Sequence, residues 1–126
     1  MKEEKDIIVY LGDDPQVISG LESDESIESH QYANGIAFKQ HLNGLADIDL
    51  VLVDQDLKGL NGKRLIDWLK DEQNGRRIFY AQTGLSALRP FDRKQLLDAG
   101  VVEYFPKPFD TGVLKKSLRH IRRFKD

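Results

Sequence analysis

Four short apolar runs constrain the fold of this chain more than any other feature. They are IIVYL at residues 7–11, LVLV at 50–53, IFYA at 78–81 and VVEYF at 101–105, and they are rich in β-branched and aromatic side chains. Continuous runs of this kind are typical of strands that are buried on both faces, as in a parallel sheet. A weaker alternating stretch, SIESHQYA at 26–33, indicates a further strand near an edge.

Helical periodicity fills the segments between these runs. The apolar positions with helical spacing are Phe38, His41, Leu42 and Leu45, then Leu65, Ile66 and Leu69, then Leu114, Leu118 and Ile121. Pro15 after Asp14 predicts a first helix behind its cap, and Asp92 with Gln95 predicts a capping box at a later helix, which Gly100 should end. Strand and helix thus alternate five times, which predicts right-handed βαβ units with helices on both faces of one sheet.

The totals predict a single domain over residues 1–126. A length of 126 residues suits one core, and 40% hydrophobic with 32% charged residues is ordinary for a globular chain. No apolar run approaches the roughly 18 residues of a membrane helix. The N-terminal MKEEKD lacks the apolar segment of a secretory signal, and cysteine is absent. We therefore expect a cytoplasmic protein without disulfides, thiolate sites or membrane contact.

Charge is unevenly distributed along the chain. Residues 1–62 hold four Lys/Arg against thirteen Asp/Glu, while residues 63–126 hold fifteen against eight, which gives net charges of −9 and +7. The last helical segment alone carries five cations, at Lys115, Lys116, Arg119, Arg122 and Arg123. Charge runs usually decorate solvated helix faces. We therefore expect no direct contact with nucleic acid.

Candidate functional residues follow the apolar runs, because the ligand crevice of an open parallel sheet lies outside the carboxyl ends of its strands. These residues are Asp13, Asp14, Asp54, Thr83, Lys107 and Pro108. The three histidines show no paired metal spacing, and His41, on an apolar helix face, should belong to the core.

These residues would bring several carboxylate and hydroxyl oxygens together at the carboxyl edge of the predicted sheet. Carboxylates gathered at one place either raise a pKa or hold a cation, and an all-oxygen ligand set points to a hard ion such as Mg²⁺. Lys107 offers a positive charge and Thr83 a hydroxyl, both suited to the oxygens of a transferring phosphoryl group. In such a site Asp54 can act as the nucleophile and form an aspartyl phosphate.

The motifs resemble one family over essentially the whole chain. LVLVDQDLKGLNG at 50–62 is similar to the DLVLLDxxLPxxxG segment of response-regulator receiver domains, the phosphorylatable half of bacterial two-component signalling, as in chemotaxis regulators. Thr83, the KPF at 107–109 and the DAGVVEYFPKPF at 98–109 fall in that family's order. The resemblance implies an α/β, flavodoxin-like three-layer sandwich with a five-stranded parallel sheet in the order 2-1-3-4-5.

The same resemblance implies roles for particular residues. Asp54 would accept a phosphoryl group from a histidine kinase or phosphotransfer protein, as a signalling switch and not an enzyme with an external substrate. Mg²⁺ (or Mn²⁺) would be held by Asp13, Asp54 and the backbone carbonyl of Asp56. The residues expected to bind or follow the phosphoryl group are Thr83, Lys107 and Tyr104, with a cis peptide at Pro108. Family members also dimerise or bind effectors through the face formed by the fourth helix, fifth strand and fifth helix.

Three departures from the family pattern keep a second hypothesis open. Gly12 replaces the first acid after the first strand, so that Asp13 aligns as the direct metal ligand and Asp14 as a helix cap; aligning on the acid pair instead makes Asp14 the ligand. Lys58 stands where proline is common. The first helix, PQVISGL at 15–21, is about one to two turns short. These departures motivate the alternative of a pseudo-receiver, a phosphorylation-independent interaction module on the same fold.

Overall fold

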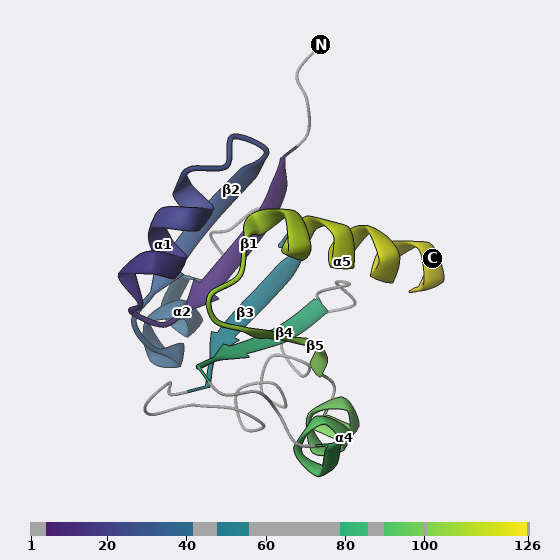
Figure 1. Ribbon diagram of the computed structural model, residues 1–126. Coiled ribbons are helices and arrows are strands. Elements are labelled where there is room, and N and C mark those ends of the chain that lie inside the picture. Colours follow the sequence, from purple (N-terminus) through teal and green to yellow (C-terminus); the bar gives the residue numbers. More distant parts are fainter. Residues whose placement is uncertain (1–4, 42–47, 56–78, 86–89, 100, 126) are drawn as a thin grey trace.

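Five parallel strands form one sheet in the order β2-β1-β3-β4-β5 (Figure 1). The computed structural model describes residues 5–41, 48–55, 79–85, 90–99 and 101–125. The strands are β1 (Asp6–Leu11), β2 (Ile27–Tyr32), β3 (Leu50–Asp54), β4 (Phe79–Gly84) and β5 (Val101–Pro106). Every residue of β3 and β4 is buried, as the apolar runs within them predict, and this burial extends to the polar residues Asp54, Gln82 and Thr83. The predicted order of strands is confirmed.

Helices cover both faces of this sheet and complete a flavodoxin-like three-layer fold. They are α1 (Pro15–Glu22), α2 (Gly35–His41), α4 (Pro90–Ala99) and α5 (Thr111–Lys125). Val17 and Leu21 of α1 share one core cluster with Leu114 and Leu118 of α5, while Phe38 of α2 packs in the cluster on the opposite face. The helix predicted around Leu65, Ile66 and Leu69, and the positions Leu42 and Leu45, lie outside the described residues.

Two local predictions are wrong. α4 begins at Pro90, whose fixed φ suits the first helical position, so Asp92 lies within the first turn and does not form the predicted capping box. In that turn its negative charge interacts favourably with the positive end of the helix dipole. His41 is exposed and not part of the core, because Phe38 takes the core position of α2. The His41 ring stacks instead on Tyr32, with ring centroids 5.6 Å apart.

The short helix α1 brings its following turn against α5. Asp24, two residues beyond the end of α1, accepts hydrogen bonds through Oδ2 from Thr111 Oγ1 at 2.7 Å and from Lys115 Nζ at 2.8 Å. Its Oδ1 accepts hydrogen bonds from the backbone N–H and the hydroxyl of Ser26. The Lys115 ammonium, followed by these hydroxyl and amide donors, holds the pKa of the Asp24 carboxyl well below its usual range. We call Asp24, Ser26, Thr111 and Lys115 the α1–α5 clasp.

None of the helices described by the structure is long and apolar enough to cross a membrane.

Candidate functional site

The carboxyl ends of β1, β3, β4 and β5 bring the candidate residues to one edge of the sheet. Asp54 is the last residue of β3 and only 7% exposed. Thr83, fully buried, is its register partner on β4, and Lys107 directly follows β5. The β1–α1 loop supplies Gly12, Asp13 and Asp14. The topology therefore places polar groups from four separate chain segments together.

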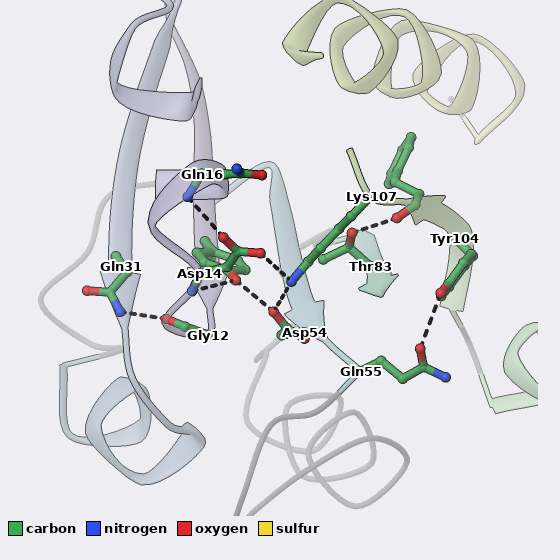
Figure 2. A network of polar contacts seen from close by, with 11 residues as sticks. Gly12, Asp14, Gln16, Gln31, Asp54, Gln55, Thr83, Tyr104 and Lys107 are labelled. Atoms are coloured by element: carbon green, nitrogen blue, oxygen red, sulfur yellow. Dashed lines mark hydrogen bonds and ion pairs between the residues drawn. The ribbon is translucent and has the colours of Figure 1, made fainter. Parts of the chain in front are cut away.

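A largely buried ammonium group joins two of the predicted carboxylates. Lys107 Nζ lies 2.7 Å from Asp54 Oδ2 and 2.8 Å from Asp14 Oδ2 (Figure 2). Burial by itself would lower the pKa of Lys107, but the hydrogen bonds to Asp14 and Asp54 outweigh it and raise that pKa. The ammonium charge is therefore secure at neutral pH. The peptide bond from Lys107 to Pro108 is cis.

Asp14 caps helix α1 with its other oxygen. Asp14 Oδ1 accepts a hydrogen bond from Gln16 N at 2.9 Å, while its Oδ2 binds Lys107. The Lys107 hydrogen bond, and then the Gln16 N–H, lower the pKa of the Asp14 carboxyl. Both oxygens of this carboxylate are thus engaged, one by the helix N-terminus and one by the ammonium.

Tyr10, which was not among the predicted site residues, is fully buried and reaches the same carboxylate from β1. Tyr10 Oη donates to Asp54 Oδ2 at 2.8 Å and accepts a longer hydrogen bond, 3.3 Å, from the backbone N–H of Asp14. Burial, and then the hydrogen bond to Asp54, raise the pKa of the Tyr10 hydroxyl well above its usual value, so it remains protonated. The available signal was an aromatic with a polar tip inside an apolar strand, since a buried tyrosine hydroxyl needs a partner.

Gly12 makes room for that hydroxyl. A Cβ added at Gly12 would lie 2.5 Å from Tyr10 Oη and 2.9 Å from Asp54 Cβ, closer than real Cβ atoms approach other heavy atoms. The glycine is also held by its backbone, because Gln31 Nε2 donates to Gly12 O at 2.6 Å and Gly12 N donates to Tyr32 O at 3.0 Å. Tyr10 and Gly12 therefore form a matched pair.

Thr83 and Tyr104, the other two residues predicted to follow the phosphoryl group, form hydrogen bonds with other partners along the same edge of the sheet. Thr83 Oγ1 donates to the backbone carbonyl of Phe105 at 2.5 Å, which ties β4 to β5. Tyr104 is buried, and its hydroxyl donates to Gln55 Oε1 at 3.2 Å, one residue beyond Asp54 (Figure 2). With these partners, the two candidates flank the Asp14, Lys107 and Asp54 cluster.

Asp13 and Asp54 offer carboxylate oxygens, the type of ligand that a hard cation prefers. Asp13 is exposed in the β1–α1 loop, and Asp54 lies at the end of the neighbouring strand β3. Mg²⁺ typically takes one or two protein carboxylates, a few further oxygens and several waters. Within the described residues no group of three metal-ligating side chains comes together. The predicted carbonyl ligand of Asp56 and the departure at Lys58 lie outside these residues.

A small cavity of about 90 Å³ opens beside the ammonium group. It is lined by Asp14, Gln16, Val17, Lys107, Pro108 and Phe109. Its walls combine the N-terminus of α1 with the Lys107 side chain, two features that attract anions. An anionic group that enters the cavity would therefore reach Lys107 without unfolding the edge of the sheet.

The fold and this edge together define an α/β protein with a buried aspartate and a lysine at the carboxyl ends of a doubly wound parallel sheet. The model of the response regulator receiver domain matches residues 12–119. The chain therefore belongs to the receiver domain family of two-component signalling, a class of phosphoryl-accepting switches.

Solved structures of receivers share the fold. One is the receiver domain of the sensor histidine kinase PA1611 from Pseudomonas aeruginosa PAO1, which holds magnesium in its active-site cleft; it is 26% identical, with 92% of this chain and 96% of that chain covered and a TM-score of 0.71. The receiver of the TMAO respiratory regulator TorR is 22% identical (96% and 99% covered, TM-score 0.76). The chemotaxis regulator CheY4 of Vibrio cholerae is 16% identical (93% and 98%, TM-score 0.70). No curated protein matches the sequence.

Proposed function

We propose that this chain, as one receiver domain over residues 1–126, accepts a phosphoryl group on Asp54 from a histidine kinase or phosphotransfer protein in the cytoplasm. The observation that carries the proposal is the buried Asp54 carboxylate with Lys107 Nζ at 2.7 Å. A carboxylate oxygen of Asp54 attacks phosphorus, an acyl phosphate bond forms, and the bond from phosphorus to the donor's nitrogen or oxygen breaks. The electron pair of the broken bond leaves with the donor.

The other residues of the site bind the charge that this transfer brings. The Lys107 ammonium interacts with the phosphoryl oxygens, and the Thr83 hydroxyl turns from the Phe105 carbonyl toward them, with Tyr104 moving inward in step. Asp13, Asp54 and the carbonyl of Asp56 would hold Mg²⁺ (or Mn²⁺), and Asp14 remains the cap of α1. When bound, the cation would neutralise charge on the phosphoryl oxygens.

The PA1611 receiver, with magnesium in its cleft, supports the choice of cation. Output through the α4, β5 and α5 face, as a dimer or with an effector, completes the proposed switch.

Mass spectrometry after incubation with acetyl phosphate tests this function. With Mg²⁺ we expect a mass gain of one phosphoryl group that is labile in base. Removal of Mg²⁺ with EDTA should abolish the gain, and Asp54→Asn should abolish it with Mg²⁺ present. Asp49→Asn serves as the matched control, since Asp49 precedes β3 at the opposite end of the strand and should leave the gain intact.

Two observations favour the alternative of a pseudo-receiver. Asp54 Oδ2 is already bound by an ammonium and a phenol, and Gly12 removes one carboxylate from the edge. A protein-interaction module would need no further chemistry there. If the intact protein takes up neither phosphate nor beryllofluoride in the presence of Mg²⁺, this second function replaces the first.

A further inference from the structure

Tyr10 holds its hydroxyl proton against the proposed phosphoacceptor. The ring is fully buried in the core cluster under α1 and α5, so the hydroxyl cannot swing to solvent without repacking that core. Tyr10 Oη accepts the N–H of Asp14 at 3.3 Å, which directs its own proton toward Asp54 Oδ2 at 2.8 Å. The positive end of the O–H dipole therefore points at the carboxylate.

The same carboxylate oxygen also accepts the Lys107 ammonium at 2.7 Å. Two donors on one oxygen stabilise its negative charge where no cation is bound. A divalent cation that approaches Asp54 withdraws charge from this carboxylate and repels the O–H hydrogen. Cation binding must therefore weaken the bond from Tyr10, and the buried ring leaves the hydroxyl few other partners.

We propose that the Tyr10 hydroxyl competes with the divalent cation for Asp54 and so raises the cation concentration that the site requires. The inference concerns the same site as the proposed function and rests on one part of that proposal, the binding of a divalent cation by Asp54. Gly12 is the second half of the device, because any side chain there would collide with the Tyr10 hydroxyl. Tyr10 is thus a positioning residue. Its hydroxyl occupies the space that an acid at position 12 would need, and it presents Asp54 with a hydrogen-bond donor where that acid would present acceptors.

Isothermal titration calorimetry of the full chain with MgCl₂ tests the competition directly. Tyr10→Phe removes the hydroxyl and keeps the ring, so the dissociation constant for Mg²⁺ should fall roughly ten-fold, which corresponds to about 1.4 kcal/mol. Tyr32→Phe is the matched control, because the Tyr32 ring packs against Phe38 and His41. The Mg²⁺ affinity of this variant should equal that of the unaltered chain. Equal affinities for all three proteins, or weaker binding by Tyr10→Phe, would overturn the proposal.

Thermal unfolding gives a readout that a purely structural hydroxyl would not change. Without Mg²⁺, Tyr10→Phe should melt below the unaltered chain, because Asp54 and the Asp14 N–H each lose a partner. Saturating Mg²⁺ should narrow that difference, since the bond is weakened in the cation-bound state. A difference that is the same with and without Mg²⁺ would contradict the competition.

A measurement on the unaltered chain covers the case in which Tyr10→Phe does not fold. Tyrosine labelled with ¹³C at Cζ reports on the hydrogen bond of each hydroxyl. Addition of Mg²⁺ should shift the Tyr10 resonance and leave that of Tyr32 in place. An unmoved Tyr10 resonance at saturating Mg²⁺ would refute the inference.

A double-mutant cycle tests the pairing of Tyr10 with Gly12. Gly12→Asp alone should lower the melting temperature, because its Cβ would meet Tyr10 Oη and Asp54 Cβ. In the background of Tyr10→Leu, which removes the obstructing ring, the same substitution should cost less and should tighten Mg²⁺ binding further. Strictly additive effects would mean that the two positions act independently.

These results separate the inference from the proposed function. If the unaltered chain is phosphorylated but binds Mg²⁺ with the same affinity as Tyr10→Phe, the proposed function stands and the inference is wrong. A gain of Mg²⁺ affinity in Tyr10→Phe, with no phosphorylation of the unaltered chain, keeps the inference and selects the pseudo-receiver. Absence of Mg²⁺ binding by every variant refutes both.

Discussion

At the scale of single residues, the site depends on hydrogen bonds that buried groups cannot exchange for water. Thr83 is completely buried, and its hydroxyl is bonded to the carbonyl of Phe105 across the β4–β5 pair. A buried acceptor that loses its donor pays the cost of desolvation without compensation. The Thr83 hydroxyl therefore stabilises the conformation described here, apart from its proposed role toward a phosphoryl group.

Thr83→Val should reduce the free energy of unfolding by about 1–2 kcal/mol, because valine keeps the shape and the β-branch but leaves the Phe105 carbonyl without this donor. Urea denaturation followed by circular dichroism measures the change. Thr83→Ser retains the hydroxyl and should recover most of the stability. If the valine variant is as stable as the unaltered chain, the bond to Phe105 contributes nothing to folding.

At the scale of elements, the length of α1 decides how the helices on one face are joined. Because α1 ends at Glu22, the turn after it carries Asp24 to the first turn of α5, where Thr111 and Lys115 bind it. The α1–α5 clasp thus holds two helices that are separated by most of the sequence. The expected shortness of the first helix is consistent with its observed eight residues.

The clasp should give stability a specific dependence on pH. At pH 7 we expect Asp24→Asn to lower the free energy of unfolding by about 1 kcal/mol, because it removes the charge that binds Lys115 while the clasp remains partly exposed. The folded pKa of Asp24 lies below its unfolded value, so this stability is complete above the unfolded pKa of about 3.9 and is lost as pH falls through the folded pKa.

Chemical denaturation of Asp24→Asn and the unaltered chain between pH 7 and pH 2 measures this dependence. The two stabilities should converge toward the acid end. Glu25→Gln, one residue away at an exposed position, should follow the unaltered chain throughout. A difference that stays constant down to pH 2 would assign the effect to shape and not to charge.

At the scale of the whole molecule, the sheet is most firmly held at its centre. β1 and β3 each pair with strands on both sides and are covered by helices on both faces, whereas β2 pairs with β1 alone at one end of the described sheet. Only Ile27 of β2 is buried, whereas every residue of β3 is buried. Opening of the central strands thus requires unfolding of the whole domain.

Hydrogen exchange followed by NMR should reproduce this gradient. Amides of Val9 to Leu11 and of Val51 to Val53 should exchange at the rate of global unfolding, and exposed positions of β2 such as Gln31 at least about ten-fold faster. Equal protection of β2 and β3 would indicate that the edge strand opens only with the core.

Much of this architecture was predictable because the spacing of apolar residues along the chain indicates which segments form strands or helices and which of their residues are buried. The LVLV run identified β3, and the position of Asp54 at its end identified the edge where Lys107 meets it. The pairing of Tyr10 with Asp54 was not predictable, since it joins residues 44 positions apart through a side chain that also belongs to the core. The capping box predicted at Asp92 was wrong because a capping pattern is only local, and α4 begins two residues earlier, at Pro90.

The fit between Tyr10 and Gly12 also limits the route by which such a sequence can change. A lineage with the aromatic at the first position cannot acquire an acid at the second in one substitution without a steric cost. The ring must be shortened first, and that intermediate carries a cavity in the core. Related sequences should therefore keep both residues or change both, so that positions 10 and 12 vary together.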